Sequence, residues 1–318
     1  MIKKTLQYAV SLALLGAAQC ASATSFYFAA HADDIELFMA RNAAYDVASN
    51  AKVVFVVTTT GSFVRGEDGS VNARGNAPFP GHAAPYYLAR EAGHTAALAT
   101  WFKQQNKTVR TNSVSQVTIG GKTVQRTEIG GAGSNVIMYN LRLTDGDDQD
   151  QSGLTWFRNQ SITSPLTRIS AVDGTASYTW TELKSFVNGL ISREQSTADT
   201  WVNLLEYWED GVNEVNYDHQ DHKTTGRLVS HALADYAAQS PTRCIRSLQW
   251  VGYATQTRPA NYTSAEASLQ SKVWTDYNVA QVNADGPNTN DSGHAVWLHR
   301  TYTSANGVNG VTNFGPCS

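Results

Sequence analysis

The sequence predicts an α/β fold of three layers, with a mainly parallel sheet between two layers of helices. Strand-like and helix-like segments alternate in the first part of the chain, as in the βα units of a parallel sheet. The run Val53-Val54-Phe55-Val56-Val57 lacks polar alternation, as expected of a strand covered on both faces. A chain of 318 residues can bury such a core. We therefore expect a Rossmann-like αβα architecture.

The first elements follow this alternation. We expect strands over Ser25–Ala30 and Lys52–Thr60, and helices over Ile35–Ala48 and Tyr86–Lys103. A further helix is predicted over Thr181–Arg193 and a further strand over Thr200–Tyr207.

A β-hairpin insertion interrupts the rhythm in the middle of the chain. Val114–Ile119 and Lys122–Ile129 are strand-like and are separated by Gly120-Gly121, a pair suited to a tight hairpin turn. A strand over Asn135–Leu143 follows, and then a polar, acidic stretch to Ser152 that is predicted to be a surface loop.

The amino terminus has the pattern of a secretory signal peptide. Lys3 and Lys4 precede an apolar stretch from Tyr8 to Ala18, and Ala21-Ser22-Ala23 offers small residues for cleavage. That stretch is shorter than the ~20 residues that span a bilayer. We expect residues 1–23 to be a signal peptide, and residues 24–318 to be a single domain that is secreted or periplasmic, without an integral membrane segment.

Two cysteines remain after cleavage, Cys244 and Cys317. Disulfides persist outside the cytoplasm, so we predict that the two pair. The alternative is two unpaired buried thiols.

The charge distribution excludes some partners. The net charge is −3 and the chain has no dense run of Lys or Arg, so nothing indicates binding to nucleic acid or to an anionic membrane. The sequence gives no indication of the oligomeric state.

Two clusters supply the residue types of a catalytic zinc site. His31-Ala32-Asp33-Asp34 follows the first strand, and His219-Gln220-Asp221-His222 follows the strand over Thr200–Tyr207. Imidazole and carboxylate are good zinc ligands, and a catalytic site typically uses three of them with water. Both clusters follow strands, where ligands bind in open α/β sheets, so we expect them to meet.

Asp33 and Asp34 are adjacent, so their side chains must diverge. One can bind a metal while the other faces water. Ordinary capping of the following helix is the alternative for this pair, and the presence of His31 and of the second cluster argues against it.

The two clusters also resemble known motifs. Ala30-His31-Ala32-Asp33-Asp34-Ile35-Glu36 is similar to Ala-His-Pro-Asp-Asp-x-Glu of the LmbE-like, or PIG-L, family of zinc-dependent de-N-acetylases, and His219–His222 is similar to its His-Pro-Asp-His. Only the proline differs in each motif. Shorter matches occur in family order: Thr58-Thr59-Thr60-Gly61, Arg90-Glu91, Leu141–Gly146, and Lys272, Tyr277 and Gln281.

The resemblance implies a role for each residue. His31, Asp34 and His222 would bind Zn²⁺, and Asp33 would be the general base. His219 would stabilise the oxyanion, as a positive charge, or donate a proton, held in place by Asp221. Arg90 would contact sugar hydroxyls, with an ordinary surface salt bridge as the alternative.

With predicted export, the resemblance implies a hydrolase that removes N-acetyl groups from N-acetylglucosamine-type sugars or glycoconjugates. Two alternatives remain open, namely a secreted zinc amidase acting on a non-sugar metabolite and a non-catalytic carbohydrate-binding protein. Some aromatic residues are candidates either for stacking on a sugar or for the core: Tyr86, Tyr87, Trp156, Trp208 and Tyr217. The hairpin and the acidic loop are candidates for the rim of the cleft.

Five histidines match no motif and are interpreted as structural: His82, His94, His231, His294 and His299. Of these, His294 is the one we expect to be able to reach the cleft, from the carboxyl-terminal region.

Overall fold

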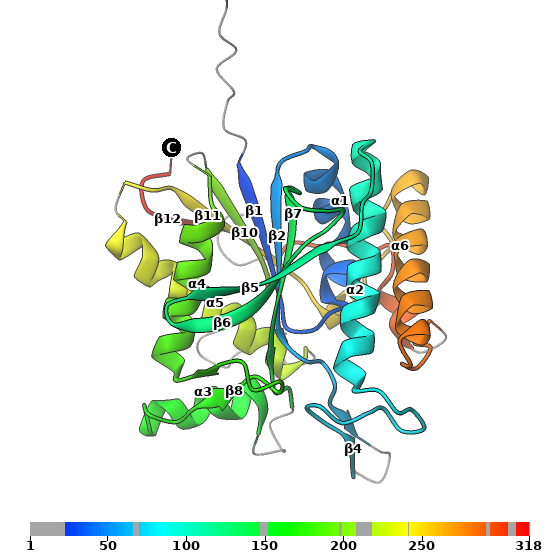
Figure 1. The fold of residues 1–318 in the computed structure, drawn as a ribbon. Helices are drawn as coiled ribbons and strands as arrows, with labels where there is room; N and C mark the ends of the chain where they lie inside the picture. The colour runs from blue at the N-terminus through cyan, green and yellow to red at the C-terminus, as the bar shows by residue number, and fades with distance from the viewer. Residues whose placement is uncertain are drawn as a thin grey trace, which may run out of the picture.

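The computed structural model describes residues 23–65, 70–146, 152–196, 199–207, 218–240, 242–290, 293–304 and 310–317 (Figure 1). The predicted signal peptide up to residue 22 lies outside these residues. So do most of the predicted acidic loop and two of the candidate aromatic residues, Trp208 and Tyr217.

Eight strands form the central sheet. They are β1 (Thr24–Ala29), β2 (Lys52–Thr59), β5 (Ser113–Ile119), β6 (Lys122–Glu128), β7 (Val136–Leu143), β10 (Thr200–Leu205), β11 (Ile245–Trp250) and β12 (Val311–Phe314). Their order is β12-β11-β10-β1-β2-β7-β6-β5. The five central strands are parallel, whereas β12, β6 and β5 are antiparallel to their neighbours. The predicted mainly parallel sheet is confirmed.

Helices cover both faces of the sheet (Figure 1). One layer contains α1 (Ala40–Ala48), α2 (Tyr86–Phe102) and α6 (Ser264–Asn283), and the other contains α3 (Gly153–Thr163), α4 (Trp180–Glu194) and α5 (Gln220–Gln239). Short two-stranded pairings, β3 (Val64–Arg65) with β4 (Val71–Ala73) and β8 (Ile169–Ser170) with β9 (Ser177–Tyr178), lie outside the main sheet.

The apolar run of β2 explains this layering. Val54 and Val56 belong to the hydrophobic cluster under α4 and α5, whereas Val53 and Phe55 belong to the cluster under α1, α2 and α6. Successive side chains of a strand point to opposite faces. An uninterrupted apolar run therefore serves two cores at once.

The order of the strands creates a crevice. The chain passes from β1 to β2 and β7 on one side, and later returns to place β10 and β11 on the other side of β1. In open α/β sheets the carboxyl ends of the strands at such a reversal form the usual ligand site. Here that position lies beyond β1 and β10.

Most predicted elements are present with boundaries shifted by a few residues. The predicted hairpin is β5–β6, with Gly120 and Gly121 at positive φ angles of 56° and 76°. It extends the sheet at its edge, and none of its residues lines the cleft described below. The elements that were not predicted include α3, β11 and β12, while Lys272, Tyr277 and Gln281 do lie on a helix, α6.

One predicted helix differs in kind. Ile35–Met39 is a π-helix that continues as α1, where a single α-helix over Ile35–Ala48 was expected. The side chain of Gln270 on α6 donates a hydrogen bond of 2.8 Å to the Glu36 carbonyl. This contact comes from a distant helix, so local periodicity does not reveal it. π-Helical turns are frequent at functional sites, and this one begins directly after Asp34.

Cys244 and Cys317 form a disulfide, as predicted, with their Cα atoms 4.8 Å apart. The bond joins the residue before β11 to the segment after β12. Across the described part of the chain, no helix has both the length and the apolar character needed to cross a membrane.

Glu194, at the end of α4, allows a prediction about acid stability. Its carboxylate lies 2.6 Å from Lys52 Nζ, accepts a hydrogen bond of 3.0 Å from Arg126 and accepts one of 2.6 Å from the Tyr139 hydroxyl. Burial raises the pKa of Glu194, but these partners outweigh it and lower the pKa to about 2. A folded-state pKa below the unfolded value means that the stabilisation is complete above pH ~4.5 and is lost as the pH falls towards 2.

We expect Glu194→Gln to reduce the free energy of unfolding at pH 7 by roughly 3 kcal/mol, the equivalent of the pKa difference. The gap from wild type should close by about pH 2. Urea unfolding at several pH values measures this. Asp235→Asn is the control, because Asp235 is half exposed and pairs only with Lys184 among the ion pairs of the described residues; its effect should stay within ~1 kcal/mol. Equal stability of Glu194→Gln and wild type at pH 7 would contradict the prediction.

Candidate metal centre

The two clusters predicted from the sequence meet at the carboxyl ends of β1 and β10. His31, Asp33 and Asp34 follow β1, while Asp218 to His222 lead into α5 after β10. β1 and β10 pair in parallel, with Phe28 opposite Leu204. This pairing brings together His31 and His222, which are 191 residues apart in the sequence.

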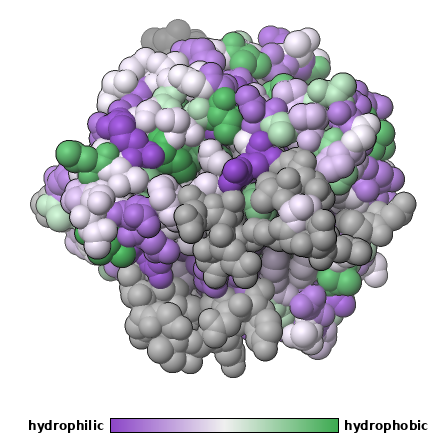
Figure 2. Space-filling view, turned by 90° about the horizontal axis from the view of Figure 1, so that it is seen from below, coloured by the Kyte–Doolittle hydropathy of each residue, from purple (hydrophilic) through white to green (hydrophobic). Residues whose placement is uncertain are grey.

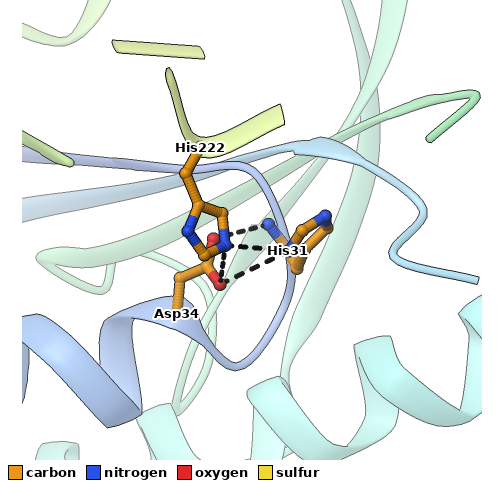
Figure 3. Close-up of side chains that lie close together, drawn as sticks. All are labelled: His31, Asp34 and His222. Carbon is orange, nitrogen blue, oxygen red and sulfur yellow. Dashed lines mark hydrogen bonds and ion pairs between the residues drawn. The ribbon is translucent and has the colours of Figure 1, made fainter. Parts of the chain in front are cut away.

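Three side chains converge there (Figure 3). His222 Nε2 lies 3.0 Å from Asp34 Oδ1 and 3.2 Å from His31 Nδ1, and His31 Nδ1 lies 3.5 Å from Asp34 Oδ1. All three residues are buried, and each offers one ligand atom to the group.

The backbone fixes the orientation of Asp34. Its Oδ2 accepts hydrogen bonds from the backbone N–H groups of Ala30 at 3.0 Å and of His31 at 2.8 Å, which leaves Oδ1 toward the histidines. Burial raises the pKa of Asp34, but His222 and His31 bring it well below its usual value. Asp34 is therefore a carboxylate over the neutral pH range.

Asp218 holds His222 from behind. Its Oδ1 lies 2.7 Å from His222 Nδ1, so that Nε2 faces the other two side chains. Burial lowers the pKa of His222, but Asp34 and Asp218 raise it well above its usual value. A Cβ on Gly252 would lie 2.2 Å from Asp218 Oδ2, so residue 252 has no room for a side chain. Asp218 directly precedes the second motif, but its role was not predicted from the sequence.

The three ligand atoms fit Zn²⁺. With metal–ligand bonds of about 2.0–2.1 Å, two ligand atoms of a tetrahedral site lie ~3.3 Å apart. The three separations here run from 3.0 to 3.5 Å. Two imidazoles and a carboxylate are an ordinary zinc set, and a histidine whose second nitrogen meets a carboxylate is the usual orienting arrangement.

We predict that Asp218→Asn weakens zinc binding by about 10–100-fold, the usual cost of losing a group that orients a metal-binding histidine. Competition titration against a chromophoric chelator measures the affinity. Asp235→Asn, which replaces a half-exposed aspartate on α5, should leave the affinity unaltered. An unchanged affinity in Asp218→Asn would contradict the inferred role.

Asp33 diverges from Asp34, as its adjacent position predicted. One oxygen, Oδ1, forms an ion pair with Arg90, and the other, Oδ2, lies 3.7 Å from His294 Nε2. Asp33 and Arg90 are both buried. The contact of Arg90 is therefore an interior ion pair with the candidate base, not the surface salt bridge that was the alternative.

The Arg90 side chain packs closely against Gly61. A Cβ on Gly61 would lie 2.9 Å from Arg90 Nε, and Gly61 has a positive φ of 57°. Glycine is required here on both counts. Burial lowers the pKa of Arg90, but Asp33 and other neighbours raise it well above its usual value, so the guanidinium stays charged.

His219 lies at the cleft but is linked to Asp221 through the backbone. The Asp221 N–H donates to His219 Nδ1 at 3.2 Å, whereas the Asp221 carboxylate accepts from Gly146 N at 3.1 Å and from Thr155 Oγ1 at 3.0 Å. Burial raises the pKa of Asp221 to about 6. Burial, His31 and His222 lower the pKa of His219 well below its usual value. The expected positive charge on His219 is corrected to a neutral ring that carries its proton on Nε2.

These residues surround a cleft of about 200 Å³. Its polar lining comprises His31, Asp33, Asp34, Arg90, Asp145, His219 and His294, and its apolar lining comprises Leu37, Phe63, Tyr253 and Trp297. Figure 2 views the molecule from below, the end toward which β1 runs in Figure 1, and shows hydrophilic and hydrophobic residues interspersed there.

The aromatic side of the cleft differs from the prediction. Tyr253 and Trp297 stack with ring centres 4.6 Å apart and line the cleft. The described aromatic candidates do not line it: Tyr86 and Tyr87 are buried on α2, and Trp156 packs against the core. Tyr253 and Trp297 follow β11 and α6, elements whose approach to the site is tertiary.

Four of the five remaining histidines lie beside residues that can be named. His94 is fully buried beside Glu36, with Nδ1 2.7 Å from Oε1. His82 meets Asp285, and His299 meets Ser271. His294 reaches the cleft, as expected.

The sequence matches no protein-family model, and none of the curated proteins matches it. The similar solved structures are distant. A triple mutant of a deacetylase of the teicoplanin biosynthetic pathway is 10% identical, with a TM-score of 0.42 over 87% of this chain and 88% of that chain. The N,N'-diacetylchitobiose deacetylase from Pyrococcus horikoshii is 12% identical, with a TM-score of 0.42 over 84% of this chain and 72% of that chain. The A40926 pseudoaglycone deacetylase Dbv21 is 14% identical, with a TM-score of 0.41 over 85% and 87%. Any function must therefore be argued from the residues of this chain.

Proposed function

We propose that this protein is a zinc-dependent de-N-acetylase that removes N-acetyl groups from N-acetylglucosamine-type sugars or glycoconjugates outside the cytoplasm. Residues 24–318 would form one deacetylase domain after removal of residues 1–23. The observation that carries the proposal is the convergence of His31, Asp34 and His222, from two distant segments, into a buried group with zinc-like spacing.

The open side of this group suits amide hydrolysis. A bound Zn²⁺ would supply an acidified water molecule and a polarised amide carbonyl. Asp33 directly precedes Asp34, lines the cleft and does not belong to this group. With Arg90 on Oδ1, its Oδ2 takes the proton of the attacking water. This is the role of a general base.

His219, which also lines the cleft, contributes to the same reaction. Its ring lies 4.7 Å from the ring of His31, centre to centre, and its Nδ1 is occupied by the Asp221 N–H. Nε2–H is therefore the group that donates to the developing oxyanion. A preorganised donor of this kind often contributes about 3 kcal/mol. Asp221 acts by fixing the loop.

Arg90 also contributes to substrate binding. Its guanidinium lines the cleft, so the N–H groups that do not meet Asp33 can contact a hydroxyl of the substrate. The stacked Tyr253 and Trp297 offer an apolar surface on the same cleft, of the kind that suits the face of a sugar ring.

Export is supported by the amino-terminal sequence and by the disulfide Cys244–Cys317, a bond that persists in an oxidising compartment. Edman sequencing of the exported protein should begin near Thr24.

The experiment is acetate release by the zinc-loaded mature chain from N-acetylglucosamine, N-acetylated oligosaccharides, glycoconjugates and non-sugar N-acetyl amines, with the free amine identified by mass spectrometry. Release from the sugars supports the proposal. Release from non-sugar amides alone would identify a zinc amidase. Saturable sugar binding without release would identify a carbohydrate-binding protein.

A further inference from the structure

His294 has no place in either motif, yet it lies against the candidate base. Its Nε2 is 3.7 Å from Asp33 Oδ2, and both side chains line the same cleft. The other oxygen of Asp33 is engaged by Arg90. His294 thus faces the one oxygen of Asp33 that is left for proton exchange.

Two indoles fix the orientation of this imidazole. Trp274 on α6 stacks on His294 with ring centres 5.9 Å apart at 28°, and Trp297 meets the same ring edge-on at 5.5 Å and 79°. Trp274 is fully buried. The short helix Gly293–Trp297 that carries His294 contacts the core through Trp297, with the imidazole beside Asp33.

The ring is also suited to receive a proton. Burial and Arg90 lower the pKa of His294, whereas Asp33 and Asp34 raise it, and the net effect is a lowered pKa. A neutral imidazole carries a proton on one nitrogen and can accept a proton on the other. A base buried beside Arg90 needs a route by which its proton can leave.

We propose that His294 is a further catalytic residue, which takes the proton from Asp33 Oδ2 onto Nε2 and delivers it to the departing amine. This inference rests on the proposed function. In the balanced reaction, one water proton passes to Asp33 as the C–O bond forms, then to His294 Nε2, and then to the amine nitrogen as the C–N bond breaks. The products are the amine and acetic acid, which ionises to acetate by releasing the second water proton to solvent, and both residues return to their starting state.

Chemical rescue tests this shuttle. In the zinc-loaded mature chain, we expect His294→Ala to lower kcat by roughly 100-fold, within the usual range for general acid–base catalysis, with KM nearly unchanged. Added imidazole should raise the kcat of His294→Ala at least tenfold, because a free base can occupy the space left by the ring. His294→Gln should be equally slow and should resist rescue, because its side chain fills that space.

Matched controls separate this result from a structural effect. His231→Ala removes a histidine nine residues beyond His222 on α5, a rise of about 13 Å along the helix, and should keep wild-type kcat with and without imidazole. The wild type in the same imidazole corrects for inhibition through the metal. Asp33→Asn should gain nothing from imidazole, because the base itself is lost.

A second readout requires neither metal nor turnover. Histidine NMR titration of the metal-free protein gives the pKa of His294, and Asp33→Asn should lower it by removing the facing carboxylate. An unchanged pKa of His294 in Asp33→Asn would overturn the inferred contact between the two side chains. An active wild type with His294→Ala at full kcat, or with loss confined to KM and no rescue, overturns the shuttle alone. A wild type that releases acetate from no substrate overturns the proposed function and the shuttle with it.

Discussion

Asp33→Asn is expected to lower kcat for acetate release by about 10³-fold while the protein still binds one equivalent of zinc. An amide in place of the carboxylate cannot take a proton from water, and general acid–base catalysis typically contributes 10²–10⁴-fold. The metal should stay because Asp33 does not belong to the group of His31, Asp34 and His222. Steady-state kinetics together with zinc analysis of the purified variant give both numbers.

The ion pair with Arg90 needs its own control. Asp33→Asn also weakens this pair, so Arg90→Gln is measured beside it. If proton transfer is the main role of Asp33, Arg90→Gln will raise KM and reduce kcat less than Asp33→Asn does. Near-normal kcat in Asp33→Asn would remove Asp33 from the role of general base.

His222→Ala is the second change with a large expected effect, because it should abolish stoichiometric zinc binding and activity together. The variant removes one of three ligand atoms and the partner of Asp218, which leaves two buried carboxylates, Asp34 and Asp218, without their shared imidazole. Zinc content after dialysis and acetate release are the two readouts. Circular dichroism checks that the fold persists.

His231→Ala on the same helix controls for loss of a histidine from α5. Chelation of wild type should reproduce the inactivity of His222→Ala, and added Zn²⁺ should restore only the wild type. Full zinc occupancy in His222→Ala would show that the metal lies elsewhere.

The sequence predicted the parts of the fold that depend on local pattern. β1, β2, α2 and the β5–β6 hairpin follow from apolar runs, helical spacing and a Gly-Gly turn, so their boundaries shifted by only one residue. α3, β11 and β12 lack such signals. The π-helix after Asp34 receives a hydrogen bond from Gln270 on α6, a tertiary contact that local periodicity cannot represent.

The residues of the candidate site also fall into those that the sequence could predict and those that it could not. Zinc chemistry and the strand ends indicated the two clusters, and the resemblance to the family motifs selected His31, Asp34 and His222 within them. Asp218 and the pair Tyr253 and Trp297 could not be predicted in this way, because orientation behind a ligand and stacking across a cleft are tertiary properties. The positive charge predicted for His219 is not supported for a related reason. Burial and the nearby His31 and His222 lower its pKa, and a linear motif does not reveal these neighbours.

The most direct test of the central claim is a crystal structure of the zinc-loaded protein with anomalous data on both sides of the zinc edge. We expect one strong peak at about 2 Å from His31 Nδ1, Asp34 Oδ1 and His222 Nε2, open toward Asp33. A fully zinc-loaded protein with no peak among these three residues, or with its peak elsewhere, would contradict it.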